Sequence, residues 1–375
     1  MTATNYAVAP GAYLEEWIDD HGLSQQEVAD MLGSSRKHVN EIINGRAPVT
    51  SETAIRLERV VGIPAAAWLR YEAAYRADRA RLTDEETLAA RVDDINPNAI
   101  SYLRKLGATR ATKSKPGALV SDFLAFHRCG TWDAYVTLHE SVNSGDYALA
   151  ALKDANSDID MTLLTTWLRA GELTEEYERG RDLSYNAAKL ESRLVDLKER
   201  ASRPDPDMLN DLAVILFEAG VVFTVVEAPK GFPVLGMTRW INKQVPVIQQ
   251  TGRWDKDGFV IWALFHEIGH VLNDPRGEMH LEYSTEKKRN SAAEKNANRF
   301  ALEVLFGEQG LEPFRDLQLD WQIERAARAA GISPGVAVHQ MHRRRLLDYS
   351  FGNKLCVSLA GTYRGASESK LHLGR

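Results

Sequence analysis

His266, Glu267 and His270 are spaced as H-E-x-x-H inside a mostly apolar stretch. On a helix, positions i and i+4 share one face, so both imidazoles can bind a single metal ion, with zinc expected. Glu267 is then placed to take a proton from a water molecule at that ion. The alternative is two core histidines beside a capped glutamate. The apolar flanks at 260–265 and 271–272 favour a rigid, partly dry metal site.

A catalytic zinc site needs a third protein ligand and one open position. Glu294 is the candidate, because it lies on the apolar face of a helix expected over 291–305, where an unpaired carboxylate is costly. Asn298, four residues later, is expected to contact a ligand histidine from the second shell. The alternatives are that Glu294 only caps or salt-bridges its helix, or that the ligand is one of the competing donors His280, Glu282 and Glu286.

Such a site predicts metal-assisted hydrolysis, most simply of a peptide bond, with Glu267 as the general base. The reaction also needs a hydrogen-bond donor for the negative charge that develops on the substrate. His339 and His342 are candidates, but a solvated basic helix end accounts for them equally well. We therefore leave both histidines out of the predicted catalytic set.

A helix-turn-helix is predicted near the N-terminus, with helices over 25–32 and 36–43 and a turn that opens at Gly33. The second helix presents side chains of the kinds that contact base edges, and the start of the first is placed for a phosphate. The predicted DNA-contacting residues are Gln25, Ser35, Arg36, Lys37 and Asn40.

The charges of this region limit its affinity for DNA. Between residues 23 and 62, five basic and five acidic side chains cancel. We expect one copy to bind an operator modestly and in a salt-sensitive way, so a homodimer is expected to be needed. The alternative is a helix-turn-helix kept only for protein interaction or dimerisation.

The whole chain has 375 residues, 44% hydrophobic and 26% charged, with a net charge of -6. These values are typical of a soluble globular protein with two or three domains, and they exclude an electrostatic nucleic-acid binder as a whole. The two cysteines, Cys129 and Cys356, form no C-x-x-C pair. With no signal peptide and no apolar run long enough to cross a membrane, a cytoplasmic protein without a membrane partner is expected.

Three regions are expected along the chain: a helix-turn-helix domain over 9–80, a helical middle region over 81–203, and an α+β metallopeptidase-like domain over 207–350. The fold class is therefore mostly α with a small α+β part. In the first region, five helices are expected over 13–20, 25–32, 36–43, 52–61 and 65–75, with N-cap oxygens from Ser24, Ser34 or Ser35, and Ser51. In the last, strands are expected over 221–227, 236–241 and 245–249, while His280 and Glu282 are expected in a polar loop.

The sequence resembles two known families. Residues 9–76 are similar to the Xre/HigA-type helix-turn-helix of phage repressors and antitoxins, and residues 207–305 are similar to the ImmA/IrrE zinc metallopeptidases. The segments that carry the second resemblance are Gly236–Ile241, Pro246–Ile248, Trp262–His270 and Glu294–Ala301, with Gly331–Val338 similar to that family's C-terminal helix and Thr166–Glu172 similar to the middle segment of long members. The resemblance implies a gluzincin-like core with one zinc ion on His266, His270 and Glu294, and Glu267 as base.

The resemblance also implies a regulatory protease that cleaves or displaces a repressor. We therefore expect a DNA-binding transcriptional regulator with zinc-dependent endopeptidase activity, acting on a repressor or antitoxin in a stress, phage or toxin–antitoxin response. The alternative is a non-enzymatic HigA-type antitoxin or repressor whose zinc fold is structural or sensory. A toxin gene beside this one would favour the alternative, and loss of a partner protein on adding zinc-loaded protein would favour the protease.

Overall fold

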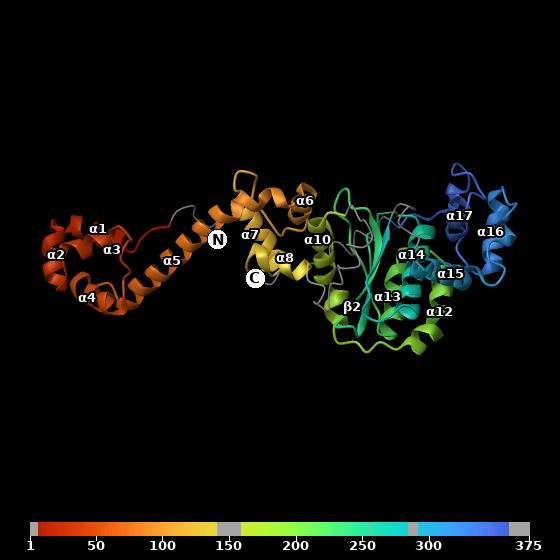
Figure 1. Cartoon of the computed structure of the whole chain (residues 1–375), viewed down its shortest axis with the longest axis horizontal. Helices are drawn as coiled ribbons and strands as arrows, with labels where there is room; N and C mark the ends of the chain where they lie inside the picture. The colour runs from red at the N-terminus through yellow and green to blue at the C-terminus, as the bar shows by residue number, and fades with distance from the viewer. Residues whose placement is uncertain (1–6, 141–158, 254, 284–291, 360–375) are drawn as a thin grey trace. The chain divides into compact units, whose positions relative to one another are not determined.

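The computed structural model describes residues 7–140, 159–253, 255–283 and 292–359, and the chain is mostly helical with a small four-stranded sheet (Figure 1). This confirms the predicted fold class. The chain forms two compact units, Met1–Val92 with Ala111–Ser121, and Asp93–Arg110 with Asp122–Arg375. The three expected domain ranges stay a prediction.

The N-terminal unit packs four short helices around one end of a long one (Figure 1). Its helices are α1 (Gly11–Asp20), α2 (Gln25–Leu32), α3 (Arg36–Ile43), α4 (Ser51–Val61) and α5 (Ala65–Leu88). Leu14, Val39 and Trp68 are fully buried in a shared core. At Gly11 a Cβ atom would lie 2.1 Å from the carbonyl oxygen of Ile42, so α1 and α3 approach through their backbones.

Two expectations for this unit are wrong. Thr50, not Ser51, caps α4, because its side chain accepts from the Thr53 amide and Ser51 is already helical. The fifth helix does not end at Tyr75 but continues to Leu88. No glycine or proline interrupts that extension, and pairs such as Glu72–Arg76 at 2.6 Å support helix by i, i+4 contact.

The middle helices of the second unit are η1 (Ala89–Asp94), α6 (Pro97–Lys105), α7 (Pro116–Phe126), α8 (Trp132–Glu140), α10 (Met161–Glu172), α11 (Glu175–Gly180), α12 (Ala187–Ala201) and α13 (Met208–Glu218), with η1 and α7 spanning the unit boundary. α10 is bonded directly to the sheet region. The Trp167 indole donates to the Val226 carbonyl at 2.9 Å, and Gln249 donates to the Trp167 carbonyl at 2.8 Å. The middle region therefore shares hydrogen bonds with the sheet.

The sheet has the order β1-β3-β2-β4, with β1 (Val222–Val225), β2 (Val234–Ile241), β3 (Val245–Gln250) and β4 (His280–Tyr283). β1 runs parallel to β3, and β2 runs antiparallel to both β3 and β4. The expectation that His280 and Glu282 lie in a polar loop is wrong, because both pair with β2 as part of edge strand β4. The short strand has too few residues for its alternation to stand out in the sequence.

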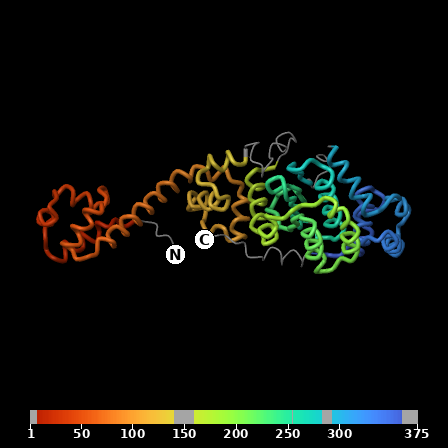
Figure 2. Tube along the Cα trace, turned by 90° about the horizontal axis from the view of Figure 1, so that it is seen from below, coloured from red at the N-terminus to blue at the C-terminus, as the bar shows by residue number. Residues whose placement is uncertain are grey.

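Four helices complete the unit: α14 (Asp257–Asn273), α15 (Ala292–Phe306), α16 (Asp320–Ala330) and α17 (Pro334–Arg343), with short turns η3 (Glu312–Phe314) and η4 (Asn353–Leu355). α14 is buried along almost its whole length and packs against β2, α15 and α17. Figures 1 and 2 show the blue C-terminal helices beside the green and cyan ones. Asp257 fixes the start of α14, since its carboxylate accepts from Ser333 at 2.7 Å and the Val357 amide at 2.9 Å.

Candidate metal centre and DNA interface

Three buried side chains from α14 and α15 converge on one point. The Nε2 atoms of His266 and His270 lie 3.1 Å apart. Glu294 Oε2 lies 3.4 Å from the first of these atoms, and Glu294 Oε1 lies 3.4 Å from the second. Helical spacing aligns the two histidines on one face of α14, and packing of α15 against α14 brings the carboxylate to them.

This spacing fits a zinc ion. In a tetrahedral site with bonds of about 2.1 Å, neighbouring ligand atoms lie about 3.4 Å apart. The observed 3.1, 3.4 and 3.4 Å agree with that geometry. Two imidazole nitrogens and one carboxylate also form the donor set of a catalytic rather than a structural zinc site.

The pKa shifts of His270 and Glu294 also support a cation site. Burial opposes a charge on His270, but hydrogen bonds with Asp274 and Glu294 raise its pKa to about 10. Burial likewise opposes the charge of Glu294, whose pKa is nevertheless held far below its usual range by His266 and His270. The acidic neighbours therefore favour positive charge at this point, and a divalent cation would supply such charge.

Asp274 orients one of these histidines. Its Oδ2 atom lies 2.6 Å from His270 Nδ1, which leaves Nε2 facing Glu294. The same oxygen lies 3.2 Å from Nε2 of His280, whose ring stacks on His270 at 4.1 Å. The sequence analysis missed Asp274, although its i+4 spacing from His270 was a usable signal.

The competing donors lie around this cluster. His280, from β4, forms a second group of possible metal ligands with His270 and Asp274, whose ligand atoms all lie within 4.8 Å of one another. Glu282 is buried on the same strand and acts on His266 and Glu267 through its charge. Glu286 lies outside the described residues.

Glu267 is fully buried and follows His266 directly on α14, beside the group formed by His266, His270 and Glu294. The Thr238 hydroxyl donates to its Oε2 atom at 2.7 Å, while its Oε1 atom has no hydrogen-bond partner. Burial raises the pKa of Glu267 to about 7, against the opposing effect of His270 and His266. A carboxyl group with one oxygen anchored and the other unpaired is suited to accept and return a proton near neutral pH.

Asn298 lies one turn after Glu294 on α15. Its amide donates to the Glu294 carbonyl at 2.7 Å, and its side-chain oxygen accepts from Arg343 of α17 at 3.2 Å. The structure therefore places Asn298 next to the ligand helix backbone and not in hydrogen bonds to the two histidines. His342 bonds to the Phe351 carbonyl at 2.9 Å, and the His339 ring packs edge-on against Phe259.

The five predicted DNA-contacting residues come from the starts of α2 and α3. Asn40 donates to the Gln25 side chain at 3.3 Å, so the two helices present these amides together. Ser35 caps α3 by accepting from the His38 amide at 3.1 Å. Arg36 is exposed, as is Lys37, which lies 3.8 Å from Glu41. Sequence analysis missed Arg56, which donates to the carbonyls of Leu32 and Gly33 and closes the turn.

Comparison with protein families gives two matches. The helix-turn-helix family matches residues 14–68, and the IrrE N-terminal-like domain family matches residues 260–342. The chain thus contains one segment similar to helix-turn-helix domains and another similar to the IrrE N-terminal-like domain. The second match contains most of α14 and all of α15, which carry the convergent side chains. No helix within the described residues combines the length and apolar character needed to cross a membrane.

Two individual proteins are also similar. Virulence-associated protein I of Dichelobacter nodosus is 39% identical over 70 residues, which are 18% of this chain and 65% of that protein. The chain therefore spans less than two thirds of that relative. A solved structure from Nostoc punctiforme, named as an antidote protein of a plasmid maintenance system, is 27% identical with a TM-score of 0.21, over 22% of this chain and 89% of its own.

Proposed function

We propose that this protein is a DNA-binding transcriptional regulator with zinc-dependent endopeptidase activity. The observation that carries the proposal is the convergence of His266, His270 and Glu294, with the free oxygen of buried Glu267 beside them. A helix-turn-helix domain and an IrrE-like peptidase domain in one chain support the combination. The substrate that we propose is a repressor or antitoxin, in a stress, phage or toxin–antitoxin response.

His266, His270 and Glu294 would hold one zinc ion. When bound, zinc supplies a Lewis acid that polarises the scissile carbonyl and makes water easier to deprotonate. Glu267 accepts the proton of the attacking water on Oε1 and passes it to the leaving amine, while Thr238 keeps Oε2 in place. Burial of the base favours this exchange, because its pKa near 7 lets it both take and return a proton.

The α2–α3 surface would supply operator binding. Arg36 and Asn40 are of the types that contact guanine and adenine edges, and Lys37 is suited to a phosphate. Because the charges of the region cancel, we propose that a homodimer binds the operator, with contacts from two copies adding together.

Metal analysis of the purified full chain tests the proposal first. We expect one zinc per chain in the wild type and a large loss in Glu294→Ala. The matched control is Glu303→Ala, on the same helix but exposed and 3.9 Å from Arg299. Equal zinc in all three proteins would show that Glu294 is not a ligand.

Cleavage is tested next with zinc-loaded protein and a library of peptides, followed by mass spectrometry. We expect defined cleavages that vanish in Glu267→Gln, although this variant keeps its zinc. If Glu267→Gln retains full biological activity while Arg36→Ala removes it, the protein is a non-enzymatic regulator with a structural or sensory zinc fold.

A further inference from the structure

Two consecutive residues of β2 contact opposite faces of the sheet. Thr238 faces α14, where its hydroxyl holds the base Glu267 at 2.7 Å. Arg239, the next residue, faces the other way, because successive side chains of a strand alternate between faces. Its guanidinium lies over the Tyr177 ring of α11 and 3.0 Å from Glu172 of α10.

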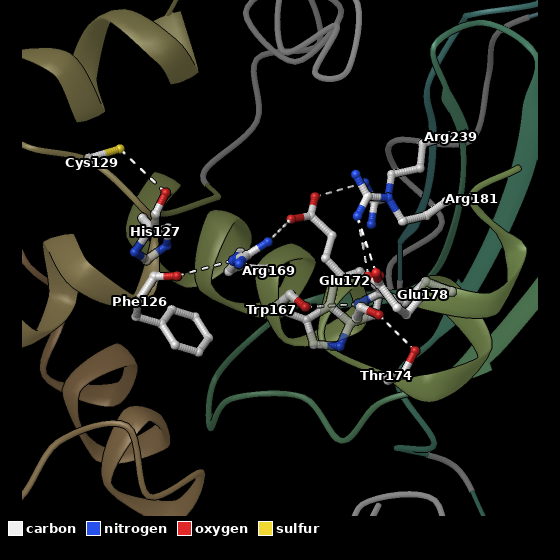
Figure 3. Close-up of polar contacts among 12 residues, drawn as sticks. Phe126, His127, Cys129, Trp167, Arg169, Glu172, Thr174, Glu178, Arg181 and Arg239 are labelled. Carbon is white, nitrogen blue, oxygen red and sulfur yellow. Dashed lines mark hydrogen bonds and ion pairs between the residues drawn. The ribbon is translucent and has the colours of Figure 1, made fainter. Parts of the chain in front are cut away.

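Glu172 is the centre of an ion network whose side chains are mostly buried (Figure 3). One carboxylate oxygen pairs with Arg239 at 3.0 Å, and the other pairs with Arg169 at 2.7 Å. Arg169 in turn donates to the Phe126 carbonyl at 3.1 Å. Side-chain exposure is only 3% for Arg239 and 9% for Glu172. The network therefore ties β2 to helix α10 and to the end of α7.

The buried Arg239–Glu172 pair restrains the position of β2 relative to α10. Removing one partner of a buried ion pair leaves an uncompensated charge, which strongly destabilises the structure around it. β2 cannot slide or twist away from α10 without breaking the contact of Arg239 with Glu172. Since Thr238 is the neighbouring residue, the same restraint fixes the distance between its hydroxyl and Glu267.

The same strand, β2, also leaves space around the other carboxylate oxygen of Glu267, Oε1. At Gly236, two residues before Thr238, a Cβ atom would lie 3.2 Å from Glu267 Oε1. That distance is tight enough that a side chain here would crowd the unpaired oxygen. β2 thus anchors one oxygen of the base through a hydroxyl and leaves room at the other through a glycine.

We propose that Thr238 is a positioning residue for Glu267, and that the Glu172–Arg239 pair of the middle region positions Thr238 through β2. The inference rests on the proposed peptidase function. It gives Glu172 of α10 a role in positioning the base. The middle region would then do more than connect the two ends of the chain.

Binding of acetohydroxamic acid to the cobalt-loaded full chain tests Thr238 without a known substrate. The probe chelates the metal and leaves its hydroxyl proton on the neighbouring base, so its affinity depends on where that carboxylate lies. We expect Thr238→Val to weaken binding about tenfold, the size of one hydrogen bond to a charged group, and Thr238→Ser to restore it.

The matched control is Thr224→Val, another buried strand threonine, which lies on β1 and whose hydroxyl bonds to that of Thr174 at 3.4 Å. This variant should bind the probe as the wild type does. If Thr238→Val and wild type bind it equally at equal cobalt content, the positioning role of Thr238 is wrong. If the wild type takes up no cobalt, the metal content itself contradicts the proposed function, and the inference falls with it.

A double-mutant cycle tests the route from α10. Glu172→Gln should weaken probe binding in the wild-type background but add little in the Thr238→Val background, because both changes act on the same contact. If Glu172→Gln does not fold, the same cycle is measured with Glu172→Asp. Glu175→Gln, which disturbs an exposed pair with Arg179, is the control and should change nothing. Fully multiplicative effects would show that Glu172 does not act through Thr238.

Discussion

The candidate metal site on α14 and α15 and the α2–α3 surface use polar side chains in opposite ways. At the cluster, polar groups are buried and fixed by contacts with each other, as in His270 with Asp274 and Thr238 with Glu267. On α3, Arg36 and Lys37 are exposed, and Lys37 makes only a long contact of 3.8 Å with Glu41. The geometry of a buried site is set by contacts within the protein, whereas interactions of exposed charges are weakened by salt.

The largest effect should come from the buried base. Glu267→Gln removes the proton acceptor but keeps the shape, so we expect peptide cleavage to fall about 10²- to 10⁴-fold. Zinc content and DNA affinity should stay at wild-type values, since the change touches only the buried site. Peptide cleavage rates and DNA affinities from gel shifts, measured on the same preparations, test the two expectations. A parallel loss of DNA binding would contradict the separation of the two sites.

Asp274→Asn should have the next largest effect. It removes the carboxylate that orients His270, and loss of such a second-shell partner typically costs about 10–100-fold in metal affinity. Competition with a zinc chelator measures the affinity. Asp78→Asn, in the other compact unit and 2.7 Å from Arg81, serves as control. Unchanged affinity would mean that His270 needs no orienting carboxylate.

On the exposed side, Arg36→Ala should weaken operator binding about tenfold, as expected for loss of a base-edge contact worth about 1–3 kcal/mol. Lys37→Ala should act on all sequences alike and lower the salt slope by about one unit. Titrations at several salt concentrations, with and without operator sequence, distinguish the two effects. Binding of both variants at wild-type strength would favour the protein-interaction alternative for this domain.

Two buried histidines outside the candidate metal site should have a smaller effect, on the free energy of unfolding at acidic pH. His127 and His139 lie 5.9 Å apart in the middle region, and burial lowers their pKa values to about 3 and about 4. These values lie below the usual 6.5, so the unfolded chain binds the protons more readily. The free energy of unfolding is therefore highest above pH 6.5. It decreases as the pH falls toward the folded pKa values of about 4 for His139 and about 3 for His127.

Urea unfolding between pH 7 and 4 measures this dependence. Each buried histidine should contribute a slope of up to about 1.4 kcal/mol per pH unit, and His127→Phe should remove its share. The same slope in wild type and variant would show that His127 takes up its proton without unfolding.

The sequence alone determined the features that depend on contacts within a few residues. The ends of α2 and α3, and the shared face of His266 and His270, follow from helical spacing and capping within one segment. The N-terminal helix-turn-helix and the peptidase-like C-terminal domain were predictable for the same reason, because their motifs are short and local.

Only the tertiary structure decided what surrounds those motifs. Thr238 precedes Glu267 by 29 residues, and Glu172 precedes Arg239 by 67, so no periodicity in the sequence pairs them. β4 was missed because a four-residue strand is defined by its partner β2 and not by its own pattern. Local propensity fixes an element, but which side chains meet across elements depends on how the whole core packs.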